Sequence, residues 1–374
     1  MDPSRLLAEL VALPSVNPAF LPAGDSRAGE QRVAEFLLCT AARAGLDVEQ
    51  RDVIAGRANL LARLAPSGRT RQRVLLAPHL DTVGGDEPQF RPQVKKGRLY
   101  GRGACDTKGS VAAMLSALLA VAGSPSRPRQ TEIVFAGLVD EEYAQRGSRA
   151  LAASGFRASL AIVGEPTRLR VVTAHKGDLW LRLETRGRAA HGATPHLGRN
   201  AVHDMARVVD VLETEYAAAL RRHRHPLLGH ATVNVGAIHG GTQPNIVPDR
   251  CSLEVDRRTL PGETRATVLR EIRTLLRRHR LTARLADSKA EPCPALETNP
   301  ERPLVREFMA VAGQARPLGV HFFCDAAVLA GGGIPSVVFG PGDIAQAHTA
   351  DEWISLRQVE RATALLTRFL SALP

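Results

Sequence analysis

The sequence predicts an α/β protein in which a mostly parallel sheet forms one domain and a smaller ferredoxin-like α+β domain is inserted into it. Short apolar, β-branched segments alternate with helical segments over residues 1–175 and 289–374, as expected for a parallel sheet. Residues 176–288 contain segments that alternate polar with apolar positions, which is typical of a sheet with one exposed face. A chain of 374 residues is long enough for both domains.

Four strands and one buried helix define the first domain. The strands are expected at residues 73–78 (RVLLAP), 131–138 (TEIVFAGL), 159–164 (SLAIVG) and 335–340 (PSVVFG). Between the first two strands, residues 110–123 (SVAAMLSALLAVAG) are long and apolar enough to form a largely buried crossover helix.

The inserted domain is expected to follow the order β-α-β-β-α-β, which is the ferredoxin-like split pattern. Its elements are a strand at 178–187, a helix near 198–222, strands at 231–240 and 251–259, a helix from 261–264 (PGET) to about 280, and a strand at 281–287.

Composition argues against nucleic-acid and membrane partners. The net charge is +11, but the arginines are scattered and only 4% of residues are aromatic, whereas a nucleic-acid surface clusters both. The apolar runs fall short of the ~20 residues that span a bilayer. The N-terminal MDPSRLLAEL lacks the long apolar region of a secretory signal. We therefore expect a cytoplasmic protein.

The cysteines favour neither disulfides nor a thiolate metal site. There are five, an odd number, at wide spacings and without a CxxC pair. We expect reduced thiols at Cys39, Cys105, Cys251, Cys293 and Cys324.

Ionisable residues follow the expected parallel strands at the point where each strand ends. Because ligands bind beyond the carboxyl ends of such strands, these side chains should meet at one edge of the sheet. Two histidines with several carboxylates and no thiolate are typical of a hydrolytic metal centre. Five ligands are too many for one catalytic ion and suit two ions ~3.5–4 Å apart. The ionisable residues expected at this edge, from which the ligands would come, are His79, Asp81, Glu141, Glu142, Glu165 and His348 after the strands and Asp106 just before the buried helix.

These motifs resemble the dinuclear-zinc amidohydrolase and exopeptidase family (the M20 peptidase family). This family includes acetylornithine deacetylase, succinyl-diaminopimelate desuccinylase, aminoacylase-type enzymes and glutamate carboxypeptidases. The similarity extends over nearly the full length of the chain. The motifs are, in order, PHLDTV, GRGACDTKG, VDEEY, GEPT, HGATPHLGRNA, NIVPDRCSLEVDRR and GPGDIAQAHTADEW.

The resemblance implies two Zn²⁺ ions, with Co²⁺ or Mn²⁺ as substitutes. His79 and Glu165 would bind one ion, Glu142 and His348 would bind the other, and Asp106 would bridge them. The family also has a cis peptide bond after the bridging aspartate, which here is Asp106–Thr107.

The resemblance further implies that Asp81 orients His79 and that Glu141 is the general base and then the general acid. If Glu142 is occupied by the metal, Glu141 remains free to take a proton from a water molecule acidified by zinc. The acidic run at 140–142 would then be explained by cations, since like charges this close otherwise raise one another's pKa.

The resemblance makes residues 176–288 a lid and dimerisation domain. His191 matches a histidine that reaches the active site of the neighbouring subunit of a homodimer and binds the oxyanion. Asn245 and Arg258 match positions that bind the substrate carboxylate, for which the planar fork of an arginine is suited. The sequence departs from the family at Pro78, where a small residue is commoner, and at HGATP, where a serine-containing loop is usual.

Similarity alone ranks the substrates. The segment GPGDIAQAHTADEW is closer to acetylornithine deacetylases, and FFCDAAVLAGGG (322–333) replaces a Gly-Gly-Thr-Ser-Asp segment of desuccinylases. We therefore expect deacylation of an N-acyl-L-amino acid in amino-acid biosynthesis, with acetylornithine first. N-succinyl substrates, carboxypeptidase or dipeptidase action on small peptides, and a non-catalytic metal-binding dimeric module stay open as alternatives.

Overall fold

The computed structural model describes residues 1–125, 127–288 and 291–374, which form two compact units. Unit 1 comprises Met1–Thr173, Thr298–Leu318 and Cys324–Pro374, and unit 2 comprises Ala174–Glu297 and Gly319–Phe323. Residues 174–175, 291–297 and 319–323, which were expected in the first domain, belong to unit 2. Unit 2 extends to Glu297 because β15 (Leu296–Glu297) pairs with the end of β8 at Ala174 and His175.

A mixed sheet with a parallel centre forms the middle of unit 1, which confirms the expected fold class. Its strand order is β1-β2-β6-β3-β7-β17-β8, with parallel pairs from β6 to β17 and antiparallel pairs at both sides. These strands are β1 (Asp47–Ile54), β2 (Arg57–Leu64), β3 (Gln72–Pro78), β6 (Thr131–Gly137), β7 (Leu160–Gly164), β8 (Val172–His175) and β17 (Ser336–Val338).

A small antiparallel sheet of order β18-β5-β4 also lies in unit 1. It joins β4 (Gln93–Lys95) and β5 (Arg98–Tyr100) to β18 (Trp353–Ser355), so segments more than 250 residues apart lie side by side. A further short strand, β16 (Leu318–Val320), pairs with β8.

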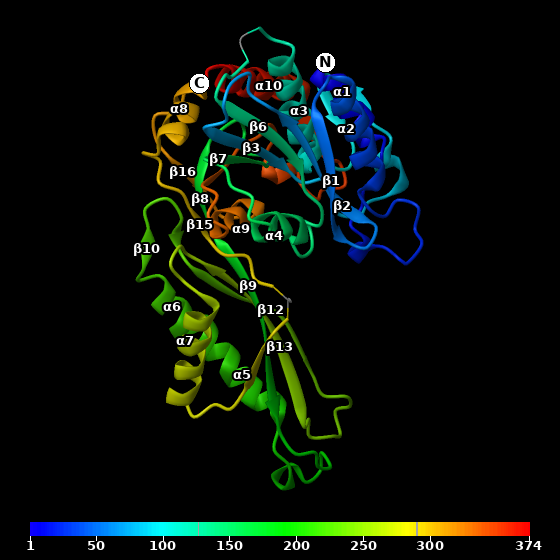
Figure 1. Cartoon of the computed structure of the whole chain (residues 1–374). Helices are drawn as coiled ribbons and strands as arrows, with labels where there is room; N and C mark the ends of the chain where they lie inside the picture. The colour runs from blue at the N-terminus through cyan, green and yellow to red at the C-terminus, as the bar shows by residue number, and fades with distance from the viewer. Residues whose placement is uncertain (126, 289–290) are drawn as a thin grey trace. The chain divides into compact units, whose positions relative to one another are not determined.

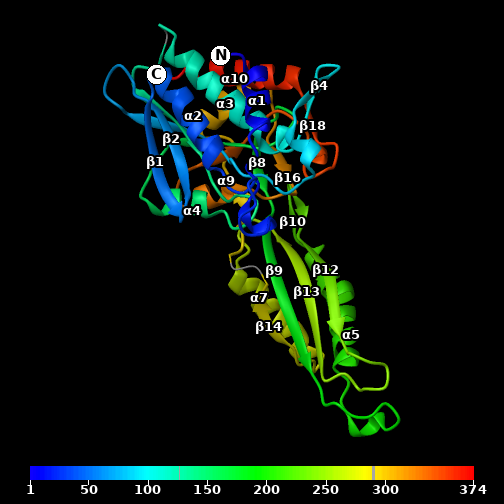
Figure 2. The same cartoon turned by 90° about the vertical axis from the view of Figure 1, so that its right-hand side faces the viewer.

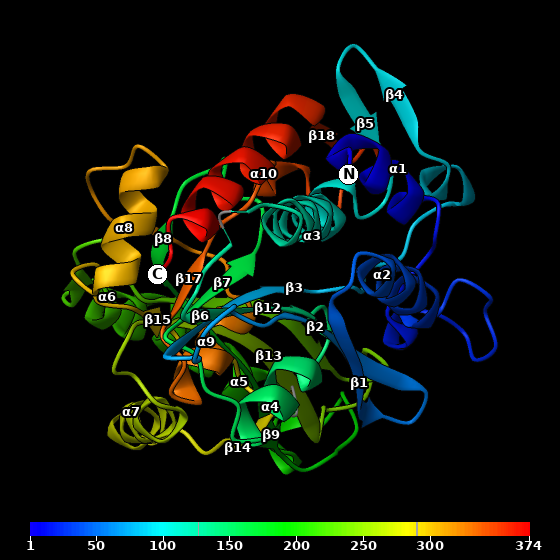
Figure 3. The same cartoon turned by 45° about the horizontal axis from the view of Figure 1, so that its top comes forward.

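Helices cover both faces of the main sheet. Figures 1 and 3 show α3 and α10 side by side on one face, and α4 and α9 on the other. The α-helices of unit 1 are α1 (Pro3–Val11), α2 (Gln31–Arg43), α3 (Gly109–Ala122), α4 (Arg146–Ala153), α8 (Pro303–Val311), α9 (Asp325–Gly331) and α10 (Leu356–Ser371). Its short helical turns are η1 (Pro18–Phe20), η2 (Glu87–Phe90), η3 (Ala104–Lys108) and η6 (Ile344–Gln346).

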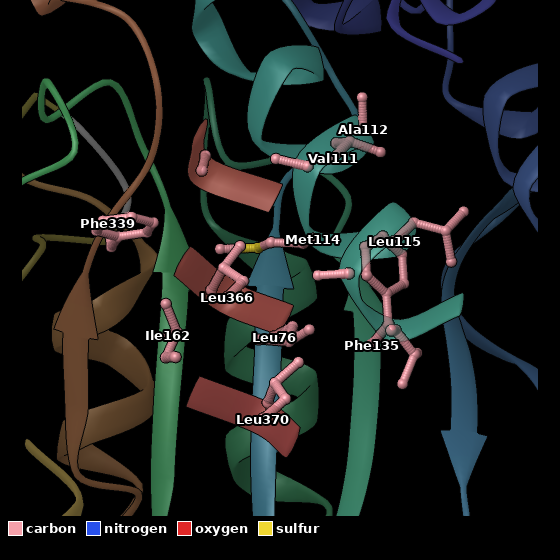
Figure 4. Close-up of a cluster of buried hydrophobic side chains, with 14 of the residues drawn as sticks. Leu76, Val111, Ala112, Met114, Leu115, Phe135, Ile162, Phe339, Leu366 and Leu370 are labelled. Carbon is pink, nitrogen blue, oxygen red and sulfur yellow. The ribbon is translucent and has the colours of Figure 1, made fainter. Parts of the chain in front are cut away.

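The core of unit 1 is built around α3, as the apolar run predicted. In Figure 4 Met114 and Leu115 of α3 lie among Leu76 of β3, Phe135 of β6 and Leu366 of α10. The segment Ala104–Ala122 is long and apolar enough to cross a membrane, but 89% of its most apolar window is buried inside the protein. Its apolar surface is therefore explained by core packing.

Unit 2 has the expected ferredoxin-like arrangement. Its antiparallel sheet has the order β12-β13-β9-β14, and Figure 2 shows the three long strands side by side. Leu181 of β9 is paired with Val255 of β13, and both pack into one core with Val208 of α5 and Ile272 of α7. The last strand begins at Arg284 rather than at 281.

The strands of unit 2 are β9 (Gly177–Arg186), β10 (Arg224–His225), β11 (Gly229–His230), β12 (Thr232–Gly240), β13 (Arg250–Thr259), β14 (Arg284–Asp287) and β15. The helical elements are η4 (Pro195–Leu197), α5 (Ala201–Val211), η5 (Leu212–Tyr216), α6 (Ala217–Leu220) and α7 (Arg265–Arg278).

Candidate metal centre

The strand ends of unit 1 bring the expected ionisable residues to one edge of the sheet. His79 follows β3 and Glu165 follows β7, and the last residues of these strands, Pro78 and Gly164, are register partners. A bridge between His79 and Leu138 brings the segment after β6 to the same edge. The acidic residues after β6 therefore lie beside the histidine that follows β3.

Asp106 lies between two imidazoles. Its Oδ1 is 3.1 Å from Nε2 of His79, and its Oδ2 is 3.4 Å from Nε2 of His348. The Asp106–Thr107 peptide bond is cis, as the resemblance implied. One carboxylate thus offers one oxygen to each of two groups, which is the arrangement of a bridging ligand.

The other carboxylates face the same two imidazoles. Oε2 of Glu142 is 3.2 Å from Nε2 of His348, and Oε1 of Glu165 is 3.8 Å from Nε2 of His79. Donor atoms of His79, Asp106 and Glu142 lie within 4.8 Å of one another, as do those of His79, Glu141 and Glu165. Oε1 of Glu142 is buried without a hydrogen-bond partner among the described residues.

The electrostatics of this cluster favour a bound cation. Asp106 and Glu142 raise the pKa of His348 to about 10. Burial raises the pKa of Asp106, but His348 and His79 outweigh it and hold that pKa well below its ordinary value. Burial, together with the charge of Asp106, raises the pKa of Glu142 to about 7 and the pKa of Glu165 well above its ordinary value. The cluster has more carboxylate than positive charge, and divalent ions would balance it.

The carboxylate of Asp81 mainly holds the acidic turn. Its Oδ1 accepts a hydrogen bond from the N–H of Glu141 and its Oδ2 accepts one from the N–H of Glu142, both at 3.1 Å. Nδ1 of His79 lies 3.0 Å from the backbone oxygen of Asp81 and 3.5 Å from its carboxylate. The expected orientation of His79 by Asp81 therefore involves the main chain more closely than the side chain.

Three residues that the sequence patterns did not indicate support the same turn. Asn17 donates from Nδ2 to Asp81 at 2.8 Å and to Asp140 at 3.0 Å. Arg57 donates to Asp140 at 3.0 Å and to the buried Glu30, which accepts from the N–H of Asp140 at 3.1 Å. Asp140 is thus explained by hydrogen bonds and an ion pair.

Glu352 is a fourth unanticipated residue, and it supports the loop that carries Asp106. It is 2% exposed and accepts hydrogen bonds from the N–H groups of Gly103, Cys105 and Asp106 at 2.9, 2.8 and 3.0 Å. It also pairs with Arg102 at 2.7 Å. Its position four residues after His348, in the motif that carries that ligand, was the signal available in the sequence.

The remaining expected site residues belong to unit 2. The loop of His191 lies against that of Asn245, because the N–H of Gly192 donates to the Asn245 carbonyl at 2.7 Å and His191 bridges Ile246. Arg258 is half-buried, pairs with Asp256 at 3.0 Å and lies 5.2 Å from the centroid of the Phe323 ring. The expected roles of His191, Asn245 and Arg258 stay predictions.

Comparison with known sequences gives consistent matches. A model of the peptidase family M20/M25/M40 matches residues 75–372. An acetylornithine deacetylase of Myxococcus xanthus is 34% identical over 322 residues, which cover 83% of this chain and 82% of the relative. An acetylornithine deacetylase of Proteus mirabilis is 30% identical over 98% of this chain and 95% of its own.

Solved structures share the fold. Aminopeptidase PepT from Bacillus cereus superimposes with a TM-score of 0.80 at 22% identity, covering 99% of this chain and 97% of its own. A dinuclear metal-binding peptidase of the M20 family from Bacillus subtilis superimposes with a TM-score of 0.72 at 13% identity, covering 99% and 96%.

Proposed function

The chain belongs to the peptidase family M20/M25/M40, and on this basis we propose that it is a metal-dependent hydrolase that cleaves the amide bond of an N-acyl-L-amino acid. The observation that carries the proposal is the carboxylate of Asp106, which faces His79 with one oxygen and His348 with the other. N-acetylornithine is the first candidate substrate, because the relatives named above are acetylornithine deacetylases at 30–34% identity.

The residues present fit two divalent ions. Imidazole nitrogens and carboxylate oxygens are ligands that zinc accepts, and the unpartnered Oε1 of Glu142 is an available donor. We assign His79 and Glu165 to one ion, Glu142 and His348 to the other, and Asp106 to both. Zinc is the proposed metal, and cobalt and manganese accept the same ligands.

When bound, the ions supply positive charge that acidifies a water molecule and polarises the substrate carbonyl. Burial raises the pKa of Glu141 well above its ordinary value, which makes this carboxylate a better proton acceptor. Glu141 takes a proton from the water molecule while the oxygen of that water attacks the amide carbon. It then gives that proton to the nitrogen as the carbon–nitrogen bond breaks, so the products are a carboxylic acid and an amine.

The hydrogen bonds to Asp81 support the division of labour between Glu141 and Glu142. Because both backbone N–H groups donate to one carboxylate, the two adjacent residues are held in one turn. The side chain of Glu142 lies beside His348, whereas that of Glu141 groups with His79 and Glu165.

We further propose a cytoplasmic homodimer that acts in amino-acid biosynthesis. In this proposal His191 of unit 2 binds the oxyanion in the active site of the second subunit, and Asn245 and Arg258 bind the substrate carboxylate. The mass of the protein in solution, compared with 40.2 kDa for one chain, tests the dimer.

The function is tested by amine release from a panel of N-acetyl and N-succinyl amino acids and dipeptides. We expect the zinc-loaded protein to hydrolyse N-acetylornithine and Glu141→Gln to lower kcat by about 10²–10⁴-fold without loss of metal. The exposed Glu87→Gln is the matched control and should leave kcat unchanged. Release from succinylated substrates or dipeptides alone would transfer the assignment to those classes. An inactive panel with folded, metal-loaded protein would contradict the enzymatic proposal.

A further inference from the structure

Glu352 and Arg102 form a buried ion pair beneath the loop that carries Asp106. Oε1 of Glu352 accepts from the N–H groups of Cys105 and Asp106, and Oε2 accepts from the N–H of Gly103. Arg102 is 4% exposed, and its guanidinium donates to the same Oε2 at 2.7 Å. Neither side chain is among the proposed ligands, yet Glu352 accepts a hydrogen bond from the backbone of Asp106, the proposed bridging ligand.

The same pair reaches the loop of His348. Nη2 of Arg102 donates at 3.2 Å to the carbonyl of Thr349, the residue that follows His348. Gln89 donates to the carbonyls of Thr349 and Ala350 at 3.2 and 2.9 Å. His348 itself is exposed and has a positive φ of 61°. The loop also has hydrogen bonds of its own, from the N–H of Gln346 to the Asp343 carbonyl and from the Thr349 hydroxyl to the Gln346 carbonyl, so Arg102 and Gln89 are what tie it to the segment before Asp106.

The other half of the centre is held differently. His79 and Glu165 follow neighbouring strands of the main sheet, whose hydrogen-bond ladder fixes their separation. The hydroxyl of Thr107 donates to the carbonyl of Gly164 at 2.9 Å, which ties Asp106 to the Glu165 side without Glu352.

We infer that Glu352 and Arg102 are positioning residues that set the separation of Asp106 from His348 and thereby control occupancy of the ion held by Glu142 and His348. The inference rests on the proposed dinuclear centre, but it does not depend on the substrate. Residues that orient metal ligands typically change metal affinity 10–100-fold when they are replaced.

The test is metal stoichiometry and affinity in Glu352→Gln. Metal-free protein is titrated with Co²⁺, whose absorption bands report each ion as it binds, and the loaded protein is then titrated with a chelator. We expect two ions in the unaltered protein, and in the variant a second ion bound 10–100-fold more weakly while the first changes by less than about threefold. The exposed Glu360→Gln is the matched control and should bind both ions as the unaltered protein does.

Gln89→Leu provides a milder variant in case Glu352→Gln does not fold. It removes the hydrogen bonds to Thr349 and Ala350 and leaves Glu352 in place. We expect the second ion to bind several-fold more weakly. A merely structural role would lower the melting temperature of the metal-free protein and weaken both ions together. The inference is overturned if the affinities for both ions fall equally, or if both affinities are unchanged. Failure of the unaltered protein to bind two ions overturns the dinuclear centre as well, so the two failures are distinguishable.

Discussion

Replacement of Asp81 by asparagine should loosen the acidic turn. The carboxylate accepts hydrogen bonds from the N–H groups of Glu141 and Glu142 and from Asn17. An amide has only one acceptor oxygen, so its NH₂ group must face at least one donor. The less costly orientation keeps the two bonds at Oδ2 and points the NH₂ group at the N–H of Glu141.

The expected loss in the free energy of unfolding follows from the hydrogen bonds that are lost or weakened. A hydrogen bond to a charged group contributes about 1.5–3 kcal/mol, and a neutral acceptor about half as much. Loss of the Glu141 bond and weakening of the other two by half gives about 3–6 kcal/mol for Asp81→Asn in the metal-loaded protein. Because the displaced backbone belongs to the proposed general base, kcat should also fall about 10–100-fold.

Urea unfolding and steady-state kinetics measure the two effects. Trp353 lies in unit 1 and Trp180 in unit 2, so a Trp180→Phe background confines the tryptophan fluorescence to unit 1. The exposed Asp52→Asn serves as the control. The reasoning is refuted if Asp81→Asn has the same unfolding free energy and kcat as this control.

Three further predictions concern buried charge. Arg57→Met should destabilise unit 1 by about 3–5 kcal/mol in urea unfolding, because it removes the cation that pairs with the buried Glu30 and the nearer of the two cations that pair with the buried Asp140. Unchanged unfolding free energy would show that water replaces the guanidinium. Burial lowers the pKa of His175 from 6.5 to about 4. The neutral imidazole therefore contributes about 3 kcal/mol to the free energy of unfolding above pH 6.5, and this contribution is lost as the pH falls to about 4. His175→Gln should flatten that pH dependence, and an equally steep profile would contradict this account. Chelation of divalent ions should lower the melting temperature, and zinc at 100 times its Kd should restore about 2.7 kcal/mol of stability, whereas identical melting with and without metal would argue against the centre.

Continuous apolar runs made the central strands predictable. β3, β6, β7 and β17 are buried on both faces, so each has a short apolar segment that needs no alternation. β1 has the sequence DVEQRDVI and is half-exposed along its length, so it contains several charged residues and no apolar run that would predict a strand. Partners distant in the sequence define β18 and β5, and no local pattern indicates such pairing.

The residues of the candidate site also differ in how far the sequence predicted them. Residues directly after parallel strands, such as His79 and Glu165, could be placed together from topology. Asp106 and His348 lie outside the strands, and although the pattern placed them at the same edge, their assignment to the bridging position and to the second ion came from the resemblance. Arg57 escaped notice because its partners are distant side chains, and the role of Glu352 escaped notice because its partners are backbone N–H groups, although its position four residues after His348 was visible in the sequence.

The contact of Asp106 with both imidazoles also constrains the order of assembly. His79, Asp106, Glu142 and Glu165 are synthesised within one stretch of the chain, whereas His348 follows Glu165 by 183 residues, with all of β9 to β17 between them. A nascent chain therefore exposes a partial acidic cluster long before the second imidazole exists. In the proposed centre, the ion held by Glu142 and His348 would be loaded only after the intervening unit has been translated, when α10 of unit 1 is still to follow.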